Sequence, residues 1–185
     1  MSLGHFLQIH LNKSESLEDD AFSQTFSYDN PVVYKEIYNT YADELYRYAH
    51  MIVRDNQLAE DVIHDVFTDL WSNRKSLDKI RNIRLYLFSS IKRRALRKLK
   101  KERKFTFFDL NNYDSYFEII PSFLDELTDV QDKEAVAKKL NACILKLSKR
   151  QREIIYLRFY QNMSYAEISQ LLGLDQKYVY NLASK

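Results

Sequence analysis

Only two glycines and two prolines occur among the 185 residues of this chain. Tight hairpin turns and strand bulges depend on these residue types, so the chain has little material from which to build an antiparallel sheet. Apolar residues instead recur at the three- and four-residue steps that place them on one face of a helix. The sequence therefore predicts an all-α fold, long enough for two small helical domains that each bury a core.

The strongest local signal is an amphipathic basic segment at residues 83–104, which reads IRLYLFSSIKRRALRKLKKERK. Its apolar residues share one helical face: Leu87, Phe88, Ile91, Ala95 and Leu99. Residues 74–104 contain fourteen Lys and Arg and two acids, a local charge of 14 − 2 = +12 in a chain whose total is +2. Such dense like charge is either a solvated face or a surface that a polyanion such as nucleic acid neutralises.

Two further helices are predicted before this segment. Asn30 and Pro31 provide an N-cap and a favoured first helical residue, and near-helical apolar spacing continues to about Val53. Residues 54–56, Arg-Asp-Asn, end this helix and offer a cap for the next one. Residues 1–29 are polar without a sustained period, and we interpret them as an N-terminal tail.

The second of these helices, LAEDVIHDVFTDLW at residues 58–71, combines a broad apolar face with a stripe of acids. Asp61, Asp65 and Asp69 repeat at four-residue steps, beside the set Glu60, His64 and Thr68. Like charges at this spacing destabilise an isolated helix by roughly 0.2–0.5 kcal/mol per pair. The stripe is therefore either an ordinary exposed face or a surface that meets a basic partner.

The charge reverses after the basic segment. Residues 105–134 contain eight acids and a single base, Lys133. Because residues that interrupt a helix also gather here, residues 105–128 predict an acidic, aromatic linker between two domains. Six aromatic side chains of the linker would be costly to leave exposed, and we expect them to dock on a domain or on a partner. They are Phe105, Phe107, Phe108, Tyr113, Tyr116 and Phe117.

Residues 129–185 predict a second helical domain. Capping boxes begin at Ser148 and Ser164, Gly173 supplies a left-handed turn residue, and Asp175 can cap the last helix. Helix, glycine turn and helix at this spacing are typical of a helix-turn-helix, whose second helix enters the major groove of DNA, although another three-helix bundle would show similar caps. The residues expected to face DNA are Gln176, Lys177, Tyr178, Tyr180, Asn181 and Lys185.

Several classes of function find no support in the sequence. Cys143 is the single cysteine, which rules out an internal disulfide and favours a reducing, cytoplasmic location, and the four histidines lack metal-ligand spacing. No apolar run approaches the roughly 18 residues of a membrane helix. Neither a phosphate-cradling glycine loop nor a nucleophile–base pair is present. We therefore expect no catalytic site, no metal, no cofactor and no membrane insertion.

Taken in order, these pieces resemble the sigma factors of bacterial RNA polymerase, in particular the extracytoplasmic-function (ECF) subfamily. LAEDVIHDVFTDLW resembles the family's core-polymerase-binding helix, and IRLYLFSSIKRRALRKLKK resembles the helix that recognises and melts the promoter −10 element. Residues 147–185 are similar to the domain that reads the −35 element. The resemblance covers roughly residues 31–185 and implies a region 2-like domain at 30–104 and a region 4-like domain at 129–185.

The resemblance also implies partners for each surface. Core RNA polymerase would bind Glu60, Asp61, His64, Asp65, Thr68 and Asp69. Promoter DNA would contact, at the −10 element, Arg84, Lys92, Arg93, Arg94, Arg97, Lys98 and Lys101. At the −35 element it would contact Ser164, Tyr165, Gln176, Lys177, Tyr178, Tyr180, Asn181 and Lys185. The linker would thread into the polymerase, and an anti-sigma factor would oppose the protein.

Two other functions stay open on the sequence alone. A stand-alone helix-turn-helix transcription regulator would bind duplex DNA tightly without polymerase, and an RNA-binding adaptor would use the basic helix on structured RNA. The resemblance favours the sigma factor, which directs promoter recognition and opens DNA by capturing unstacked bases. Stacking or pocketing a base is worth roughly 1–3 kcal/mol, comparable with the cost of melting a step, so no nucleotide hydrolysis is required.

Overall fold

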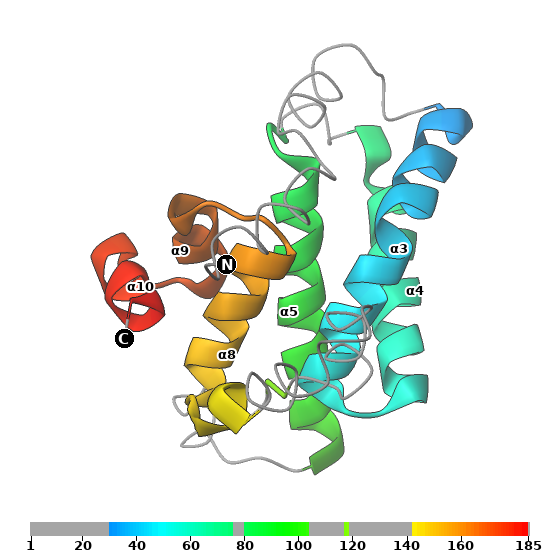
Figure 1. The fold of residues 1–185 in the computed structure, drawn as a ribbon. Coiled ribbons are helices and arrows are strands. Elements are labelled where there is room, and N and C mark those ends of the chain that lie inside the picture. Colours follow the sequence, from blue (N-terminus) through cyan, green and yellow to red (C-terminus); the bar gives the residue numbers. More distant parts are fainter. Residues whose placement is uncertain (1–29, 76–79, 104–116, 119–141, 185) are drawn as a thin grey trace, which may run out of the picture. The chain divides into compact units, whose positions relative to one another are not determined.

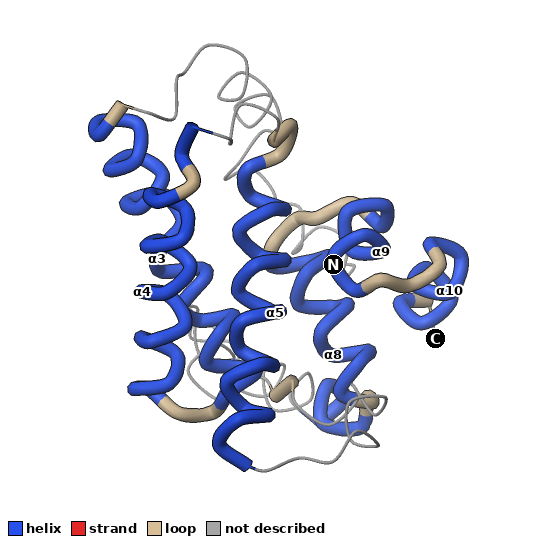
Figure 2. Tube along the Cα trace, turned by 180° about the vertical axis from the view of Figure 1, so that it is seen from behind, coloured by secondary structure: helices blue, strands red, loops and turns tan. Residues whose placement is uncertain are grey.

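The computed structural model describes residues 30–75, 80–103, 117–118 and 142–184. Within these ranges the regular elements are all helical, as Figures 1 and 2 show, which confirms the predicted all-α class. They are α3 (Pro31–Val53), α4 (Asn56–Ser72), α5 (Ile83–Arg103), α8 (Lys149–Ile155), the π-helix η4 (Tyr156–Tyr160), α9 (Tyr165–Leu172) and α10 (Gln176–Ala183).

The chain divides into two compact units. The described part of the first unit comprises residues 30–50, 55–75 and 80–98, and that of the second comprises residues 51–54, 99–103, 117–118 and 142–184. The expected N-terminal tail lies outside the described residues. Of the expected linker, only Phe117 and Glu118 are described.

The ends of α3 and α4 lie where local capping chemistry predicts them. The Asn30 side chain accepts a hydrogen bond from the Val32 N–H at 2.9 Å at the start of α3. Arg54 adopts a left-handed backbone with φ of 59° after α3, and the Asp55 carboxylate accepts the Leu58 N–H at 2.7 Å to begin α4. These caps satisfy backbone groups that a helix terminus leaves without intrahelical partners.

Aromatic side chains join the three helices of the first unit. Tyr34 on α3 meets Trp71 on α4 edge-on at 5.0 Å between ring centroids, and its hydroxyl donates to the Phe67 carbonyl at 3.2 Å. Tyr48 on α3 lies 5.1 Å from Phe88 on α5. The apolar stripes expected on α4 and α5 are buried, except for the half-buried Trp71. This packing fixes which polar faces of α4 and α5 remain outside the core.

The second unit confirms the predicted helix starts and turn. Ser148 and Ser164 each form a capping box, with Gln151 and Glu167 as their respective partners. Gly173 ends α9 in the left-handed conformation with φ of 65°. The Asp175 side chain then accepts two backbone N–H groups at the start of α10. The predicted helix–glycine–helix arrangement is therefore present.

One feature of the second unit was not predicted, and another was expected only in general terms. The helix that begins after Ser148 is α-helical only to Ile155 and then widens into the π-helix η4, after which the buried Gln161 side chain donates to the Tyr156 hydroxyl at 2.8 Å. Phe117 from the linker is also buried, with its ring 5.6 Å from that of Tyr156. One aromatic residue of the linker therefore docks on a domain, as expected, whereas the other five lie outside the described residues.

Candidate functional site

Helix α5 exposes a row of cations along one edge. Arg93, Arg97 and Lys101 follow one another at four-residue steps and are exposed. The Arg93 guanidinium bonds within its own helix, to the Ser89 carbonyl at 3.3 Å and the Ser90 hydroxyl at 3.4 Å. We call Arg93, Arg97 and Lys101 the outer edge of α5. Its positive charge is directed to solvent and is available to a polyanion.

The neighbouring edge of α5 faces the acids of α4. The Lys98 ammonium lies 3.5 Å from an Asp61 carboxylate oxygen and 3.0 Å from one of Asp65. The Arg94 guanidinium lies 3.9 Å from Asp65 and also pairs with Asp69. We call this set of three acids and two cations the α4–α5 charge ladder.

The charge ladder changes how the acidic stripe is understood. The acids of the stripe pair with cations of α5 within the same protein, whereas the sequence suggested either an ordinary exposed face or a basic partner. The carboxylates stay partly open, with side chains 39% to 60% exposed, while Arg94 and Lys98 are 30% and 23% exposed. Pairs this accessible to water contribute at most about 1 kcal/mol each, so an external cation can compete for the acids.

The other predicted residues of α4 lie on a different side, toward α3. Glu60, His64 and Thr68 line a groove that also includes the rings of Tyr34 and Tyr38. The His64 Nδ1 lies 3.5 Å from the Thr68 hydroxyl oxygen. Burial, and secondarily Tyr38, raises the pKa of Tyr34 above its usual value, which keeps its hydroxyl protonated. The six predicted polymerase-binding residues therefore form two adjoining faces rather than one.

Two more cations predicted to bind DNA are partly covered. The Arg84 guanidinium forms two 3.3 Å contacts with the carboxylate of Glu44 on α3 and lies 5.4 Å from the Phe88 ring centroid. Lys92 is half-buried. Glu44 was not singled out from the sequence, because nothing in its local pattern distinguishes it from other exposed acids of α3. Arg84 is therefore more firmly positioned than the cations of the outer edge.

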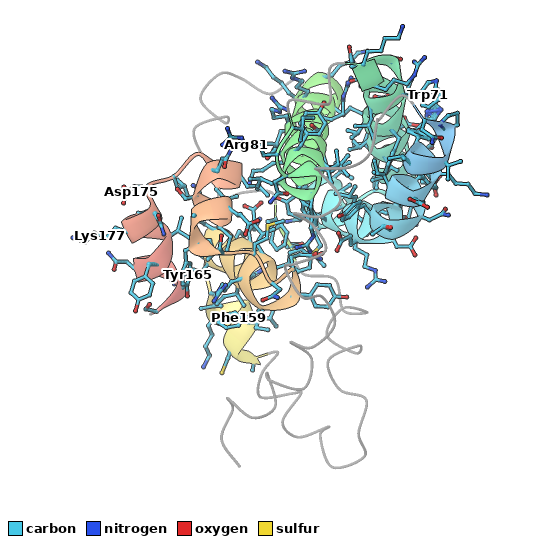
Figure 3. The ribbon with its side chains drawn as sticks, turned by 90° about the horizontal axis from the view of Figure 1, so that it is seen from above. Trp71, Arg81, Phe159, Tyr165, Asp175 and Lys177 are labelled. Carbon is cyan, nitrogen blue, oxygen red and sulfur yellow. The ribbon has the colours of Figure 1, made fainter. Side chains whose placement is uncertain are left out.

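The recognition surface of the helix-turn-helix contains little charge. Gln176, Lys177, Tyr178, Tyr180 and Asn181 are all exposed on α10, whereas Val179 is buried. Figure 3 shows Lys177 projecting outward near the start of this helix, close to the N-cap Asp175. The predicted residue Ser164 is used in the α9 capping box, and Lys185 lies outside the described residues.

An aromatic–cation cluster supports this surface. The Tyr165 ring, on α9, meets the Tyr180 ring edge-on at 5.4 Å, and the Arg158 guanidinium carbon lies 4.9 Å from the Tyr165 ring centroid. Arg158 also donates to the Met163 carbonyl at 2.9 Å. The role of Arg158 could not be predicted from the sequence, because the residues that hold it come together only when η4 and α9 pack.

The described residues offer neither a metal site nor a membrane-spanning helix. No group of three His, Cys, Asp or Glu side chains there is arranged to hold a metal ion. No helix in those ranges has the length and apolar character needed to cross a membrane. The candidate interfaces are therefore the faces of α4, α5, α9 and α10.

The surfaces described above lie in two segments of the chain that match models of known protein families. Residues 37–105 match Sigma-70 region 2, and residues 137–185 match Sigma-70, region 4, so the two matches span more than half of the chain. The chain belongs to the sigma-70 family. The region 2 match contains α4, α5 and the charge ladder of this sigma factor, and the region 4 match contains α8 to α10.

Individual relatives of this sigma factor are themselves sigma factors, and SigK is named as a member of the ECF subfamily. The ECF RNA polymerase sigma factor SigK of Mycobacterium tuberculosis (strain ATCC 25618 / H37Rv) is 21% identical over 161 residues, which cover 84% of this chain and 82% of SigK. The RNA polymerase sigma factor YlaC of Bacillus subtilis (strain 168) is 20% identical over 139 residues, covering 75% and 79%. The predicted ECF subfamily is confirmed.

Two solved structures share the fold of this sigma factor. CnrH, solved in complex with the cytosolic domain of CnrY, aligns with a TM-score of 0.55 at 19% identity, covering 90% of both chains. RpoE of Bartonella quintana, solved in complex with the anti-sigma factor NepR, aligns with a TM-score of 0.53 at 21% identity, covering 82% of this chain and 89% of RpoE. At these identities the likeness shows the fold alone.

Proposed function

We propose that this protein acts as an ECF sigma factor that binds core RNA polymerase, directs it to promoters and takes part in opening the DNA. The observation that carries the proposal is the order of three surfaces in one chain: the acidic faces of α4, the cationic outer edge of α5, and the helix-turn-helix of α9 and α10. Each surface is built to bind, so the protein contributes recognition and the polymerase contributes catalysis.

Core polymerase is proposed to bind both faces of α4, through Glu60, Asp61, His64, Asp65, Thr68 and Asp69. Aromatic rings beside carboxylates, as in the groove with Tyr38 and Glu60, suit the cationic side chain of a partner. The acids of the charge ladder suit further cations, because their carboxylates are partly exposed. A basic helix of the polymerase would satisfy both faces.

Promoter DNA at the −10 element is proposed to lie along α5, at Arg84, Lys92, Arg93, Arg94, Arg97, Lys98 and Lys101. Phosphate contacts from these cations position the protein, and each contributes a log–log salt slope of about −0.7 to −0.9. The cations of the outer edge are exposed, so they can contact phosphates without first leaving another partner in the charge ladder. Arg94 and Lys98 must leave the charge ladder before they can bind a phosphate fully.

The −35 element is proposed to be read by Ser164, Tyr165, Gln176, Lys177, Tyr178, Tyr180, Asn181 and Lys185. In helix-turn-helix proteins the second helix reads base edges in the major groove. The second helix of this motif is α10. The protein would work in the cytoplasm, where core polymerase is found. We also propose regulation by an anti-sigma factor, because RpoE, which shares the fold, was solved with the anti-sigma factor NepR.

The first test is size-exclusion chromatography of the purified protein mixed with core RNA polymerase. Glu60→Lys reverses a charge in the groove, where none of the charge-ladder ion pairs is disturbed. Glu36→Lys is the matched control, because it makes the same change on the exposed side of α3 away from Tyr34 and Tyr38. We expect the wild type and Glu36→Lys to migrate with the polymerase, and Glu60→Lys to do so less completely.

A wild-type protein that never joins the polymerase would contradict the sigma-factor function. Tight binding to duplex DNA by the protein alone would then support a stand-alone regulator, and a preference for structured RNA would support an adaptor. Equal migration of both variants with the polymerase would instead remove the groove from the proposed binding surface. Transcription from a selected promoter by the reconstituted holoenzyme completes the test.

A further inference from the structure

We propose that the −35 element of this protein is rich in A·T base pairs, and that Tyr178 and Tyr180 recognise thymine methyl groups. The inference rests on the proposed function of α10 as the recognition helix. It names the base composition of the DNA that this helix reads.

The first observation is the exposure of the two tyrosines on α10. Their side chains are 51% and 54% exposed, whereas Val179 between them is fully buried. Successive helical residues are rotated by about 100°, so Tyr178 and Tyr180 flank the face opposite Val179, with Lys177 and Asn181 between them. A DNA duplex that meets this face contacts a polar centre with an aromatic ring on each side.

The second observation is that the Tyr180 ring has a supported position. Its neighbour Tyr165 holds it edge-on at 5.4 Å, and Arg158 lies over Tyr165 at 4.9 Å. The hydrogen bond from Arg158 to the Met163 carbonyl, at 2.9 Å, anchors this arrangement to the backbone. A ring that is held before DNA arrives loses less conformational entropy on binding, which favours its use as a contact.

The polar residues of the same face point to the same base pairs. Asn and Gln form bidentate hydrogen bonds with adenine, and apolar groups contact the methyl group of thymine. Asn181 on this face and the exposed Gln176 at the start of α10 supply the amides, and the two tyrosines supply apolar surface. Arg and Lys are the residues that read guanine, and Lys177 is the only cation of α10.

The remaining ionised group near this face is already engaged. The Asp175 carboxylate accepts the N–H groups of Lys177 at 2.9 Å and Tyr178 at 3.1 Å. A carboxylate can read cytosine by accepting from its amino group, but Asp175 would have to give up part of its cap to do so. The described part of α10 therefore matches adenine and thymine more completely than guanine and cytosine.

The experiment uses holoenzyme assembled from core RNA polymerase and the full chain. Duplex promoter DNA randomised at both elements is selected for binding, and the enriched −35 sequence is read. Each thymine in it is then replaced by deoxyuridine, which removes only the methyl group. We expect an A·T-rich −35 sequence. Replacing one or two of its thymines should lower the affinity about fourfold, which is the contribution of burying one methyl-sized apolar group.

Protein variants assign the methyl contact to its residue. In Tyr178→Ala or Tyr180→Ala the sensitivity to deoxyuridine should disappear at the position that each ring contacts. Lys177→Ala is the matched control: it should weaken binding but keep that sensitivity. Thymines between the two elements serve as the DNA control and should be insensitive in every protein.

A G·C-rich selected sequence, or full affinity after every thymine replacement, would overturn the inference. Either result would leave the proposed function intact, because the holoenzyme would still have selected a promoter. Failure of the protein to join core polymerase is the separate result that would contradict the proposed function. Because the Tyr178 side chain is exposed, the circular dichroism spectrum of Tyr178→Ala should match that of the wild type, which checks that the variant folds normally.

Discussion

The two helices proposed to face DNA use different chemistry. Helix α5 contains nine Lys and Arg and one acid within Ile83–Arg103, whereas α10 contains one cation and no acid within Gln176–Ala183. The first is suited to phosphates, whose attraction is long-range and weakened by salt, and the second to base edges, whose recognition is short-range. The comparison indicates that α5 supplies most of the electrostatic affinity and α10 supplies contacts that depend on sequence.

Within α5 itself the cations are divided between two tasks. The outer edge is exposed, while Arg94 and Lys98 take part in the charge ladder with the acids of α4. The ladder has a consequence for the proposed function, since the same acids are expected to meet the polymerase. A polymerase cation that binds Asp65 would release Arg94 or Lys98 toward DNA, so the two binding events would favour each other.

The largest effect is expected from removing the outer edge. Arg93→Ala/Arg97→Ala/Lys101→Ala should lower the magnitude of the log–log salt slope of promoter binding by about 2 to 3, because three phosphate contacts are lost. The measurement is holoenzyme affinity for promoter duplex over a range of salt concentrations. The matched control is Lys35→Ala/Lys146→Ala, which removes exposed cations outside α5 and should leave the slope unchanged. An unchanged slope in the triple variant would contradict the division of α5 into two edges.

The next effect concerns the charge ladder. Asp61→Lys/Asp65→Lys places new cations beside Arg94 and Lys98 and should lower the free energy of unfolding by about 1–2 kcal/mol, since the pairs are partly exposed and screened. Urea denaturation followed by circular dichroism measures the change.

Asp61→Asn/Asp65→Asn is the matched control for this variant. It removes the attraction without adding repulsion and should cost less than the charge reversal. If both variants unfold like the wild type, the ladder contributes nothing to stability. Loss of polymerase binding in the Asn variant, with its stability kept, would assign the acids to the polymerase directly.

A smaller effect is expected at the turn between α9 and α10, where a substitution changes the position of α10 without changing any charge. Gly173→Ala places a side chain at φ of 65°, where no atom lies within 4 Å of the new carbon, so the cost is backbone strain alone, roughly 1 kcal/mol. Thermal unfolding should show this loss. Relaxation of this backbone strain would turn α10 relative to α9, so −35 recognition should weaken while the salt slope set by α5 stays constant. A changed slope would show that the two helices do not act separately.

Local chemistry explains which parts of the fold the sequence predicted. The caps at Asp55, Ser148, Ser164 and Asp175 depend on residues two or three positions apart, so their patterns are visible in the chain. The buried stripes of α4 and α5 follow equally from helical spacing. The helix starts at these caps and most residues of the two buried stripes were therefore predicted correctly.

Features that depend on packing between elements were not predicted. The contact of Lys98 with Asp61 requires a particular alignment of α4 against α5, which charge counting cannot give. The π-helix η4 and the hydrogen bond from Gln161 to Tyr156 depend on the interior that the surrounding helices create. The candidate site was thus predicted as a set of residues, but its division into faces came only from the structure.

The smallest effect is expected at Lys177, and it tests most closely the difference between α5 and α10. Lys177→Ala removes the only cation of α10, so the salt slope of promoter binding should fall by no more than about 0.7–0.9, the contribution of one phosphate. A larger fall would mean that Lys177→Ala also disturbs contacts made by other cations of the helix-turn-helix domain. No fall would mean that Lys177 contacts a base edge or solvent. In that case α10 would contribute sequence preference without adding to the salt dependence that the cations of α5 provide.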